Sequence, residues 1–249
     1  MAAVEFAPQL IEALRAAERV LIFTGAGVSA ESGLPTFRDP QQGLWAKFRP
    51  EDLATPEAFA RDPETVWRWY QWRRRMHADV APNPGHHAIA ALEARLPQAT
   101  LVTQNVDRLH ELAGSAAPIH LHGHLFRNRC ADCGSAMPEV APEIDTPPLC
   151  TSCGGLCRPD IVWFGEGLPA EPWEAAARAA QEAEIVLSIG TSATVHPAAE
   201  LPRMAHRTGA LVVQVNPQPT RLDPIAHNLR GPSAKILPAL VAAVWGRRV

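Results

Sequence analysis

The chain has 249 residues, of which 47% are hydrophobic and 20% charged, a balance typical of a globular protein and not of a disordered one. The net charge of −3 gives no general attraction to nucleic acid. No apolar run approaches the ~18 residues that a membrane-spanning helix needs, and the start of the chain carries Glu5 and no basic residue, unlike a secretory signal. We therefore expect a cytoplasmic protein of one or two domains that binds neither membrane nor nucleic acid.

Short apolar strands alternate with amphipathic helices along most of the chain. The first part predicts helices at Leu10–Ala17, at Ala88–Leu96 and from Asp107 to Leu112, and strands at Val20–Phe23 and Thr100–Thr103. The last part predicts strands at Ile161–Phe164, Ile185–Ile189 and Leu211–Val215, and helices at Trp173–Glu182, Ala198–Arg207 and Ile236–Val244. This alternation favours an α/β fold with a mostly parallel sheet.

Two segments interrupt the alternation and are interpreted as insertions between elements of the sheet. Residues 40–80 are rich in Trp, Arg and Pro, which predicts short helices and loops. Residues 126–158 have few periodic apolar positions and hold all five cysteines.

The first strand runs into a glycine-rich turn of the form G-x-G-x-x-A at Gly25–Ala30. Glycines let a backbone turn tightly and approach a pyrophosphate, although a purely structural turn would have the same pattern. The acidic residue that dehydrogenases place ~20 positions further on, for the ribose, is not obvious here. Asn216, at the end of a later strand, is a candidate for that contact. The pattern predicts a dinucleotide bound in a way that differs from dehydrogenases.

Four cysteines form a C-x2-C…C-x2-C pattern with 16 residues between the pairs: Cys130, Cys133, Cys150 and Cys153. Four thiolates close a tetrahedral Zn²⁺ site and leave no position for a substrate, so we predict one structural zinc ion per chain. Cys157 is interpreted as a small buried residue and not as a ligand. Redox-active cysteine pairs and a nucleic-acid-binding zinc ribbon are the alternatives, and the segment is not notably basic.

Three histidines alternate at His120, His122 and His124, so on a strand they would face one side. Metal hydrolases use such H-x-H pairs, but we find no matching cluster of acidic ligands. A single histidine beside a nucleotide is better explained as a general base, because its pKa near ~6.5 suits proton abstraction at neutral pH. An ordinary surface or core position remains open for His120 and His124.

Six segments together resemble the motifs of sirtuins, which are NAD-dependent protein-lysine deacylases. They are Gly25–Arg38, Thr103–His110, His122–Gly123, the four cysteines, Trp163–Glu166 and Gly190–Ser192. The resemblance runs through nearly the whole chain. It implies an α/β fold with a Rossmann-like parallel sheet in a large domain, made of residues 1–39, 81–125 and 159–249. A small domain would consist of a zinc-binding module, residues 126–158, and a helical insert, residues 40–80, with NAD in the cleft between the domains.

The resemblance also implies which residues contact NAD. The phosphate loop would be Gly25, Ala26, Gly27 and Ser29, and the cofactor loop would include Phe37, Arg38 and Trp45. The nicotinamide side would be held by Gln104, Asn105 and Asp107. The phosphate and adenosine side would be held by Gly190, Thr191, Ser192, Asn216, Gln218 and Ala234. Two positions depart from the usual family pattern: Gln218 stands where an acidic residue is more usual, and Thr36 where many deacetylases have Asp.

The resemblance implies that His122 is the catalytic histidine of the family's reaction. The acyl oxygen of the substrate attacks the ribose C1′, nicotinamide leaves, and the histidine deprotonates the ribose hydroxyls; the products are free lysine, nicotinamide and O-acyl-ADP-ribose. Val162, Phe164 and Gly165 belong to the segment that would pair with the substrate backbone, a mode that tolerates many sequences. The implied partners are acylated-lysine proteins or peptides, and a monomer is expected.

The segments Asp52–Pro56 and Tyr70–Arg73 resemble the sirtuins that remove succinyl and malonyl groups. Tyr70 and Arg73 share a helix face at i, i+3, and a guanidinium with a phenol can bind the carboxylate of such an acyl group. The same residues would also suit an ordinary solvated helix rich in cation–π contacts. A plain deacetylase, a mono-ADP-ribosyltransferase and a non-catalytic NAD-binding module are the alternative functions.

Overall fold

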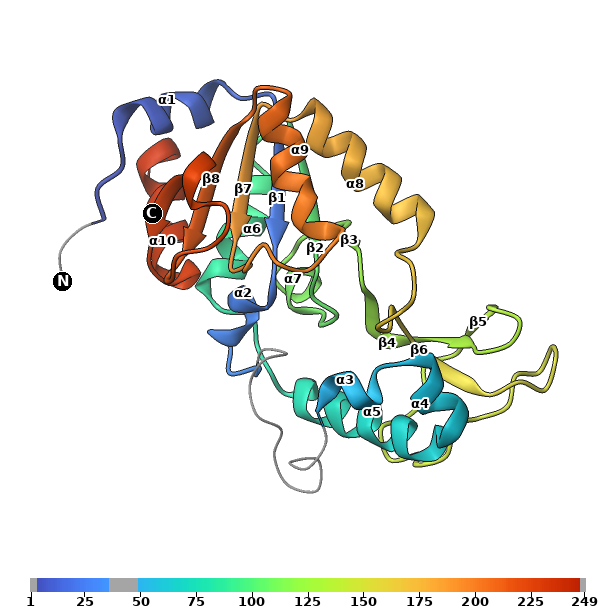
Figure 1. Cartoon of the computed structure of the whole chain (residues 1–249). Helices are drawn as coiled ribbons and strands as arrows, with labels where there is room; N and C mark the ends of the chain where they lie inside the picture. The colour runs from blue at the N-terminus through green and yellow to red at the C-terminus, as the bar shows by residue number, and fades with distance from the viewer. Residues whose placement is uncertain (1–3, 36–48, 247–249) are drawn as a thin grey trace.

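The computed structural model describes residues 4–35 and 49–246 (Figure 1). The expectations for Thr36, Phe37, Arg38 and Trp45 lie outside the described residues. Among the helices that are described, none combines the length and apolar character needed to cross a membrane.

The larger sheet has six strands in the order β3-β2-β1-β7-β8-β9. All of its strand pairs are parallel. The strands are β1 (Arg19–Thr24), β2 (Gln98–Thr103), β3 (Ile119–His120), β7 (Ile185–Ile189), β8 (Leu211–Asn216) and β9 (His227–Arg230). Parallel neighbours need long crossover connections, which here are mostly helical. The predicted α/β fold with a Rossmann-like parallel sheet is therefore confirmed.

Helices cover both faces of this sheet, and strand β1 shows how (Figure 1). Val20 and Ile22 belong to the core beneath α1 (Pro8–Ala16), α6 (Pro84–Glu93) and α10 (Ser233–Trp245). Leu21 and Phe23 belong to the core beneath α8 (Ala170–Glu182), η2 (Ala198–Glu200) and α9 (Leu201–Arg207). A strand buried on both faces is apolar throughout, which explains the continuous apolar run in the sequence. The short elements α2 (Ala26–Ala30), α7 (Leu109–Leu112) and η3 (Asp223–Ile225) complete this part.

A second, antiparallel sheet has the order β5-β4-β6 and lies against three helices. Its strands are β4 (Gly123–Cys130), β5 (Ala136–Met137) and β6 (Cys157–Ile161), and the helices are α3 (Pro50–Leu53), α4 (Pro56–Arg61) and α5 (Pro63–Ala78). The helix α5 is 16 residues long, so this insert is more regular than the expected short helices and loops. It begins where the Asp62 side chain accepts a hydrogen bond from the Thr65 N–H at 3.1 Å. Trp69, Tyr70 and Trp163 form the core between α5 and the small sheet.

The predicted strand at Ile161–Phe164 is wrong, because strand β6 ends at Ile161. After Val162, the N–H groups donate away from the sheet: Trp163 N–H to the Glu166 carboxylate at 2.8 Å and Phe164 N–H to the Ala54 carbonyl at 2.9 Å. Gly165 then turns the chain with a φ of +88°. Ile161 and Trp163 are buried in the core beside α5, whereas Phe164 is largely exposed.

The division into a large and a small domain stays a proposal. Its boundaries at 125/126 and 158/159 fall inside strands β4 and β6. The small sheet therefore extends a few residues into both flanking segments of the proposed large domain.

Candidate functional site

The candidate site lies at the carboxyl ends of the parallel strands. Strand β1 pairs with β2 on one side and with β7 on the other, so the strand order reverses at β1. Ligands of open α/β sheets bind in the crevice at such a switch point. The expected cofactor residues follow the ends of β1, β2, β7 and β8, so the fold brings most of them to one edge.

The glycine-rich turn and the loop after β7 touch each other backbone to backbone. The Gly27 N–H donates to the Gly190 carbonyl at 2.9 Å, and the Gly25 N–H to the Ile189 carbonyl at 3.0 Å. A Cβ at Gly27 would lie 2.7 Å from the Gly190 oxygen, and one at Gly190, whose φ is +61°, 2.5 Å from the Val28 nitrogen. These glycines are thus required by the contact between the two loops. Ala26 and Gly27 open α2 in the same turn.

Ser29, Asn105 and Asp107 form a buried polar cluster. The Ser29 hydroxyl donates to Asp107 Oδ2 at 2.8 Å and accepts from Asn105 Nδ2 at 3.0 Å. Asp107 Oδ1 accepts from the Leu109 N–H at 3.0 Å, so Asp107 supports the start of α7, although Arg108 occupies the N-cap position. Burial raises the pKa of Asp107, and its hydrogen bonds act in the opposite direction. The expected phosphate contact of Ser29 stays a prediction, and its hydroxyl bonds within this cluster.

A second chain of contacts joins the loops after β2, β7 and β8. Gln104 Nε2 donates to Thr191 Oγ1 at 2.9 Å, and Asn216 Nδ2 donates to the Thr191 carbonyl at 3.0 Å. Ser192 Oγ lies 2.8 Å from Thr194 Oγ1. The side chain of Asn216 also accepts from the N–H of Gln218, which is exposed. Thr191 therefore sits between the two sides of the expected dinucleotide site.

Ala234 lies at the start of α10. Its N–H faces the Glu31 carboxylate, with oxygens at 3.2 and 3.3 Å, and the Ser233 hydroxyl donates to the same carboxylate. Glu31 thus satisfies free N–H groups at the helix N-terminus. The expected adenine contact of Ala234 stays a prediction.

His122 lies in the short connection between β3 and β4. Its Nδ1 atom lies 3.0 Å from the Gln104 carbonyl, which only accepts, so Nδ1 carries the proton and Nε2 keeps its lone pair. Burial lowers the pKa of His122, and the bond to Gln104 acts in the opposite direction. The imidazole is therefore neutral at neutral pH and has a free basic nitrogen.

The three alternating histidines do not face one side, which corrects that expectation. His120 Nε2 lies 2.8 Å and His124 Nε2 3.7 Å from Glu111 Oε1, whereas His122 contacts Gln104. The extended repeat breaks because β3 ends at His120 and Gly123 has a φ of +78°. Sequence reasoning missed Glu111, because no spacing rule connects a short helix to this strand.

Two adjacent arginines on α5 have different surroundings. Arg74 is buried, and its guanidinium donates to the Leu125 carbonyl at 2.8 Å, to Asn128 Oδ1 at 2.6 Å and to Gln71 Oε1 at 3.0 Å. Arg73 is half-buried, and its guanidinium lies 5.2 Å from the Trp69 ring centre and 5.8 Å from that of Tyr70. Within the described residues, no carboxylate forms an ion pair with Arg73.

Tyr70 is buried, and its phenol oxygen accepts a hydrogen bond from Trp163 Nε1 at 2.9 Å. Burial raises the pKa of Tyr70 to about 12. The phenol therefore keeps its proton, and the indole N–H occupies one lone pair of its oxygen. The hydroxyl hydrogen remains as the donor that Tyr70 can offer to another group.

The segment Val162–Gly165 is held from several sides. The Val162 N–H donates to the His122 carbonyl at 3.0 Å, which connects this segment to the catalytic candidate. The Arg158 guanidinium lies 3.3 Å from the Trp163 ring centre and contacts both oxygens of Glu166, at 2.6 and 2.9 Å. Phe164 is 48% exposed. The N–H groups of Val162, Trp163 and Phe164 are used inside the protein, so the expected substrate contacts of Val162, Phe164 and Gly165 stay predictions.

The four predicted zinc ligands lie together at one end of the small sheet. All four Sγ atoms are within 4.8 Å of one another, with Cys130 and Cys153 at 3.4 Å and Cys133 and Cys150 at 3.8 Å. Tetrahedral Zn²⁺ with bonds of about 2.3 Å places sulfur atoms about 3.8 Å apart, whereas a disulfide needs about 2.05 Å. None of the five cysteines forms a disulfide. The cluster therefore fits a structural zinc ion, and Cys157 lies outside it, buried in β6.

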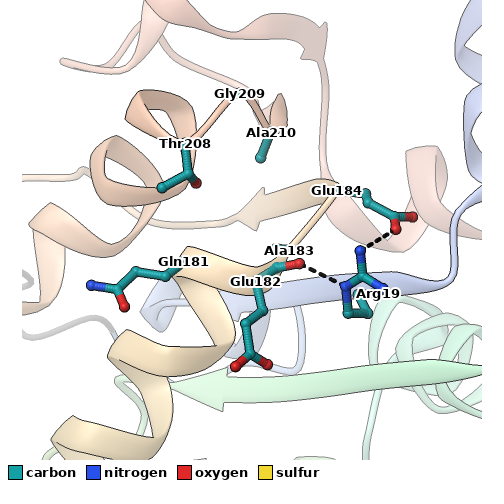
Figure 2. A pocket seen from close by; sticks show the side chains of 8 residues that line it. All are labelled: Arg19, Gln181, Glu182, Ala183, Glu184, Thr208, Gly209 and Ala210. Carbon is teal, nitrogen blue, oxygen red and sulfur yellow. Dashed lines mark hydrogen bonds and ion pairs between the residues drawn. The ribbon is translucent and has the colours of Figure 1, made fainter.

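A surface hollow lies at the opposite end of the large sheet (Figure 2). It is lined by residues that precede β7 and β8 and by Arg19, at the start of β1. The Arg19 guanidinium donates to Glu184 Oε1 at 2.6 Å and to the Glu182 carbonyl at 2.9 Å. This hollow is remote from the glycine loops and from His122, so it is not the candidate site.

The known proteins that are similar to this chain are named as deacylases or as Sir2 proteins. The chain is 51% identical over 235 residues to "NAD-dependent protein deacylase 2" of Pyrobaculum aerophilum, covering 94% of each chain. It is 52% identical over 241 residues to "NAD-dependent protein deacylase 1" of Pseudomonas aeruginosa, covering 93% of this chain and 96% of the relative. A solved Sir2 homolog–NAD complex is 44% identical, with a TM-score of 0.91 and coverage of 98% and 96%. A Sir2 structure bound to acetylated peptide is 28% identical, with a TM-score of 0.86 and coverage of 98% and 100%.

The family model described as the Sir2 family matches residues 25–197. This range contains the glycine-rich turn, His122, the four cysteines and the loop after β7. The chain belongs to the Sir2 family.

Proposed function

We propose that this protein removes acyl groups from lysine side chains of proteins, with NAD as a consumed co-substrate, and that it prefers acyl groups that end in a carboxylate. Deacylation itself is supported by the names of relatives about half identical to this chain and by the NAD-bound and peptide-bound family structures. The acyl preference is supported by one observation: Arg73 has no carboxylate partner among the described residues.

His122 is the proposed general base. The Gln104 carbonyl holds the proton of its Nδ1 atom, and Nε2 accepts a proton from a ribose hydroxyl of the bound co-substrate. NAD supplies the ribose C1′ carbon, to which the acyl oxygen of the substrate bonds as nicotinamide leaves. With water consumed, the products are free lysine, nicotinamide and O-acyl-ADP-ribose.

The protein's other proposed task is to hold the dinucleotide across the switch point of the sheet. The glycine loops let the backbone approach a pyrophosphate closely, as phosphate-binding turns do, while the N–H groups of Gly25, Gly27 and Gly190 themselves bond to carbonyls within the protein. Asn105 and Asp107 lie on the loop that carries Gln104, next to His122, where the nicotinamide ribose is proposed to bind. Asn216, which follows β8, is the candidate for the adenine ribose.

The proposed acyl pocket contains one cation and one hydroxyl donor. Arg73 offers a guanidinium, which binds a carboxylate with two parallel hydrogen bonds. Because Trp163 donates to the Tyr70 oxygen, Tyr70 presents its hydrogen, and a carboxylate accepts it. Succinyl and malonyl groups carry such a carboxylate, whereas an acetyl group would leave both donors without a partner, which disfavours it.

The test compares succinyl-, malonyl- and acetyl-lysine peptides of one sequence with NAD, measuring nicotinamide release by wild type and by Arg73→Met. We expect the variant to lose about 10- to 100-fold in kcat/KM on the two acidic substrates and little on the acetyl peptide. Arg68→Met is the matched control, since Arg68 is exposed on the same helix. An unchanged ranking of the three peptides contradicts the acyl preference.

Mass spectrometry of the products tests the reaction itself. Free lysine peptide together with O-acyl-ADP-ribose supports deacylation. A protein or peptide that gains ADP-ribose and keeps its acyl group would instead show mono-ADP-ribosyl transfer, and intact NAD with every peptide would show a non-catalytic NAD-binding module.

A further inference from the structure

Four successive carbonyl groups, from the last residue of strand β2 onward, all accept hydrogen bonds from one segment, residues 120–125. Thr103 accepts from the Leu121 N–H at 3.0 Å and Val106 from the Leu125 N–H at 2.8 Å. Between them, Gln104 accepts from His122 Nδ1 and Asn105 from His120 Nδ1, each at 3.0 Å. Backbone N–H groups thus bond to the first and the last of the four carbonyls, and two histidine rings bond to the two between them. We call these four bonds the 103–106 seam.

His120 has a second contact, with Glu111 on helix α7. A carbonyl only accepts, so His120 Nδ1 carries a proton, and a neutral ring would then turn its Nε2 lone pair toward Glu111 Oε1. Two acceptors do not approach to 2.8 Å unless a cation lies between them. The cation is either a proton, which makes the contact an ion pair when it lies on His120 and not on Glu111, or a metal ion.

The geometry favours the proton. Tetrahedral zinc with bonds of about 2.1 Å would hold the nitrogen and oxygen about 3.4 Å apart, whereas 2.8 Å is the length of a charge-assisted N–H···O bond. His124 Nδ1 accepts from the Phe126 N–H at 3.2 Å, so its Nε2 carries the hydrogen and offers no lone pair to a metal. Burial alone would raise the pKa of Glu111, but the hydrogen bond with His120 and the nearby His124 ring outweigh it and lower this pKa.

We propose that Glu111 and His120 are positioning residues that hold the 103–106 seam in place for the reaction. The ion pair keeps the His120 ring against the Asn105 carbonyl. The neighbouring Gln104 carbonyl then stays where it holds the Nδ1 proton of His122, which leaves the basic Nε2 atom free. Among the described residues, the Glu111 carboxylate pairs with His120 and lies near His124, and it forms no hydrogen bond or ion pair with His122, so it acts through His120. The effect on turnover rests on the proposed function.

Glu111→Leu removes the partner of His120, and Glu111→Gln keeps it. The glutamine amide can donate to the lone pair of a neutral His120, so the Nδ1 proton stays on the Asn105 carbonyl. The second carboxylate oxygen of Glu111 has no hydrogen-bond partner within residues 4–35 and 49–246, so the amide loses no contact there. Glu200→Leu is the control, because Glu200, on η2, pairs with the exposed His196 at 3.8 Å and takes no part in the 103–106 seam.

The first readout does not need activity. Nitrogen-15 NMR of the histidine rings should show His120 protonated on both nitrogens and His122 on Nδ1 in wild type. Amide hydrogen exchange of Leu121 and Leu125 should accelerate on the order of tenfold in Glu111→Leu and stay unchanged in Glu111→Gln and Glu200→Leu. Unchanged exchange in Glu111→Leu, or a second metal ion per chain at this cluster, would overturn the proposal.

The second readout is nicotinamide release. We expect kcat to fall on the order of tenfold in Glu111→Leu and to return to near wild type in Glu111→Gln, with equal thermal stability of the two variants. Equal loss in both variants would assign Glu111 another role. If wild type releases no nicotinamide, the proposed function fails, while the NMR and exchange results still decide whether the ion pair holds the seam.

Discussion

The two sheets of this protein are stabilised in different ways. The parallel sheet lies between two large apolar cores, so its strands need no bound ion to stay together. Around the cysteines of the small sheet, residues 131–136 are exposed, and the large side chains Ile144 and Leu149 are 45% and 64% exposed. Its apolar core lies at the other end, against α4 and α5. The parallel sheet is therefore held by buried apolar surface on both faces. The small sheet has such a core only at one end, and its other end carries the four cysteines that fit a zinc ion.

Because of this difference, the two regions should respond differently to substitutions. The candidate base and the dinucleotide loops are carried by the edge of the parallel sheet, whereas the small region supplies Tyr70, Arg73 and the segment around Trp163. Changes in the small region should alter stability or substrate choice, and changes at the sheet edge should alter the handling of NAD.

Loss of zinc should have the largest effect. Cys150→Ser removes one ligand of the tetrahedral site, and the segment around it has too little apolar core to stay folded alone. The zinc content, measured by metal analysis, should fall from about one ion per chain to none. The rate of amide hydrogen exchange should increase strongly over residues 130–157. The strands β1, β7 and β8 should keep their protection. Loss of protection throughout both sheets would contradict the comparison.

Arg74→Met should have the next largest effect, on stability. Its guanidinium connects α5 to strand β4 through the Leu125 carbonyl and Asn128, and these acceptors would be left buried without a donor. We expect the free energy of unfolding to fall by about 3 kcal/mol, measured by urea denaturation. Arg73→Met, one residue away, should change it much less. If the two variants unfold alike, the contrast between the adjacent arginines is wrong.

Gly27→Ala tests the contact between the two loops at the edge of the parallel sheet. The added Cβ would lie 2.7 Å from the Gly190 oxygen, so the loops must separate, at a cost of about 1–3 kcal/mol. Calorimetry should show a lower Tm and weaker NAD binding. Gly167→Ala is the control, because a Cβ there meets no atom within 4 Å. Full NAD affinity in Gly27→Ala would show that the loops tolerate separation.

The smallest expected effect is the pH dependence of turnover. The pKa of His122 is lowered from 6.5 by burial, and the neutral ring is the active form. Nicotinamide release should therefore decline toward acidic pH, and the midpoint of this decline should lie below pH 6.5. An acidic limb centred above 6.5 would show that His122 is not the group that titrates.

Several features were determined by the sequence alone, because local spacing encodes them. The alternation of strands and helices gave the α/β class, since a parallel strand needs a long crossover and reads as a continuous apolar run. The paired cysteines predicted the zinc cluster, because two C-x2-C turns place four thiolates around one ion. The motif order indicated the family, and the glycine-rich turn marked the edge of the sheet where the site lies.

Other features were decided only by the tertiary structure. Arg73 and Arg74 belong to one run of basic residues. Only the packing of α5 on β4 shows that Arg74 donates its hydrogen bonds within the protein, while Arg73 has no carboxylate partner among the described residues. Trp163 donates to Tyr70 across 93 positions of sequence. Glu111 meets His120 because α7 folds back on β3. These contacts join residues that are far apart or on different elements, and the local sequence around one residue does not indicate the other, so no local pattern predicts them.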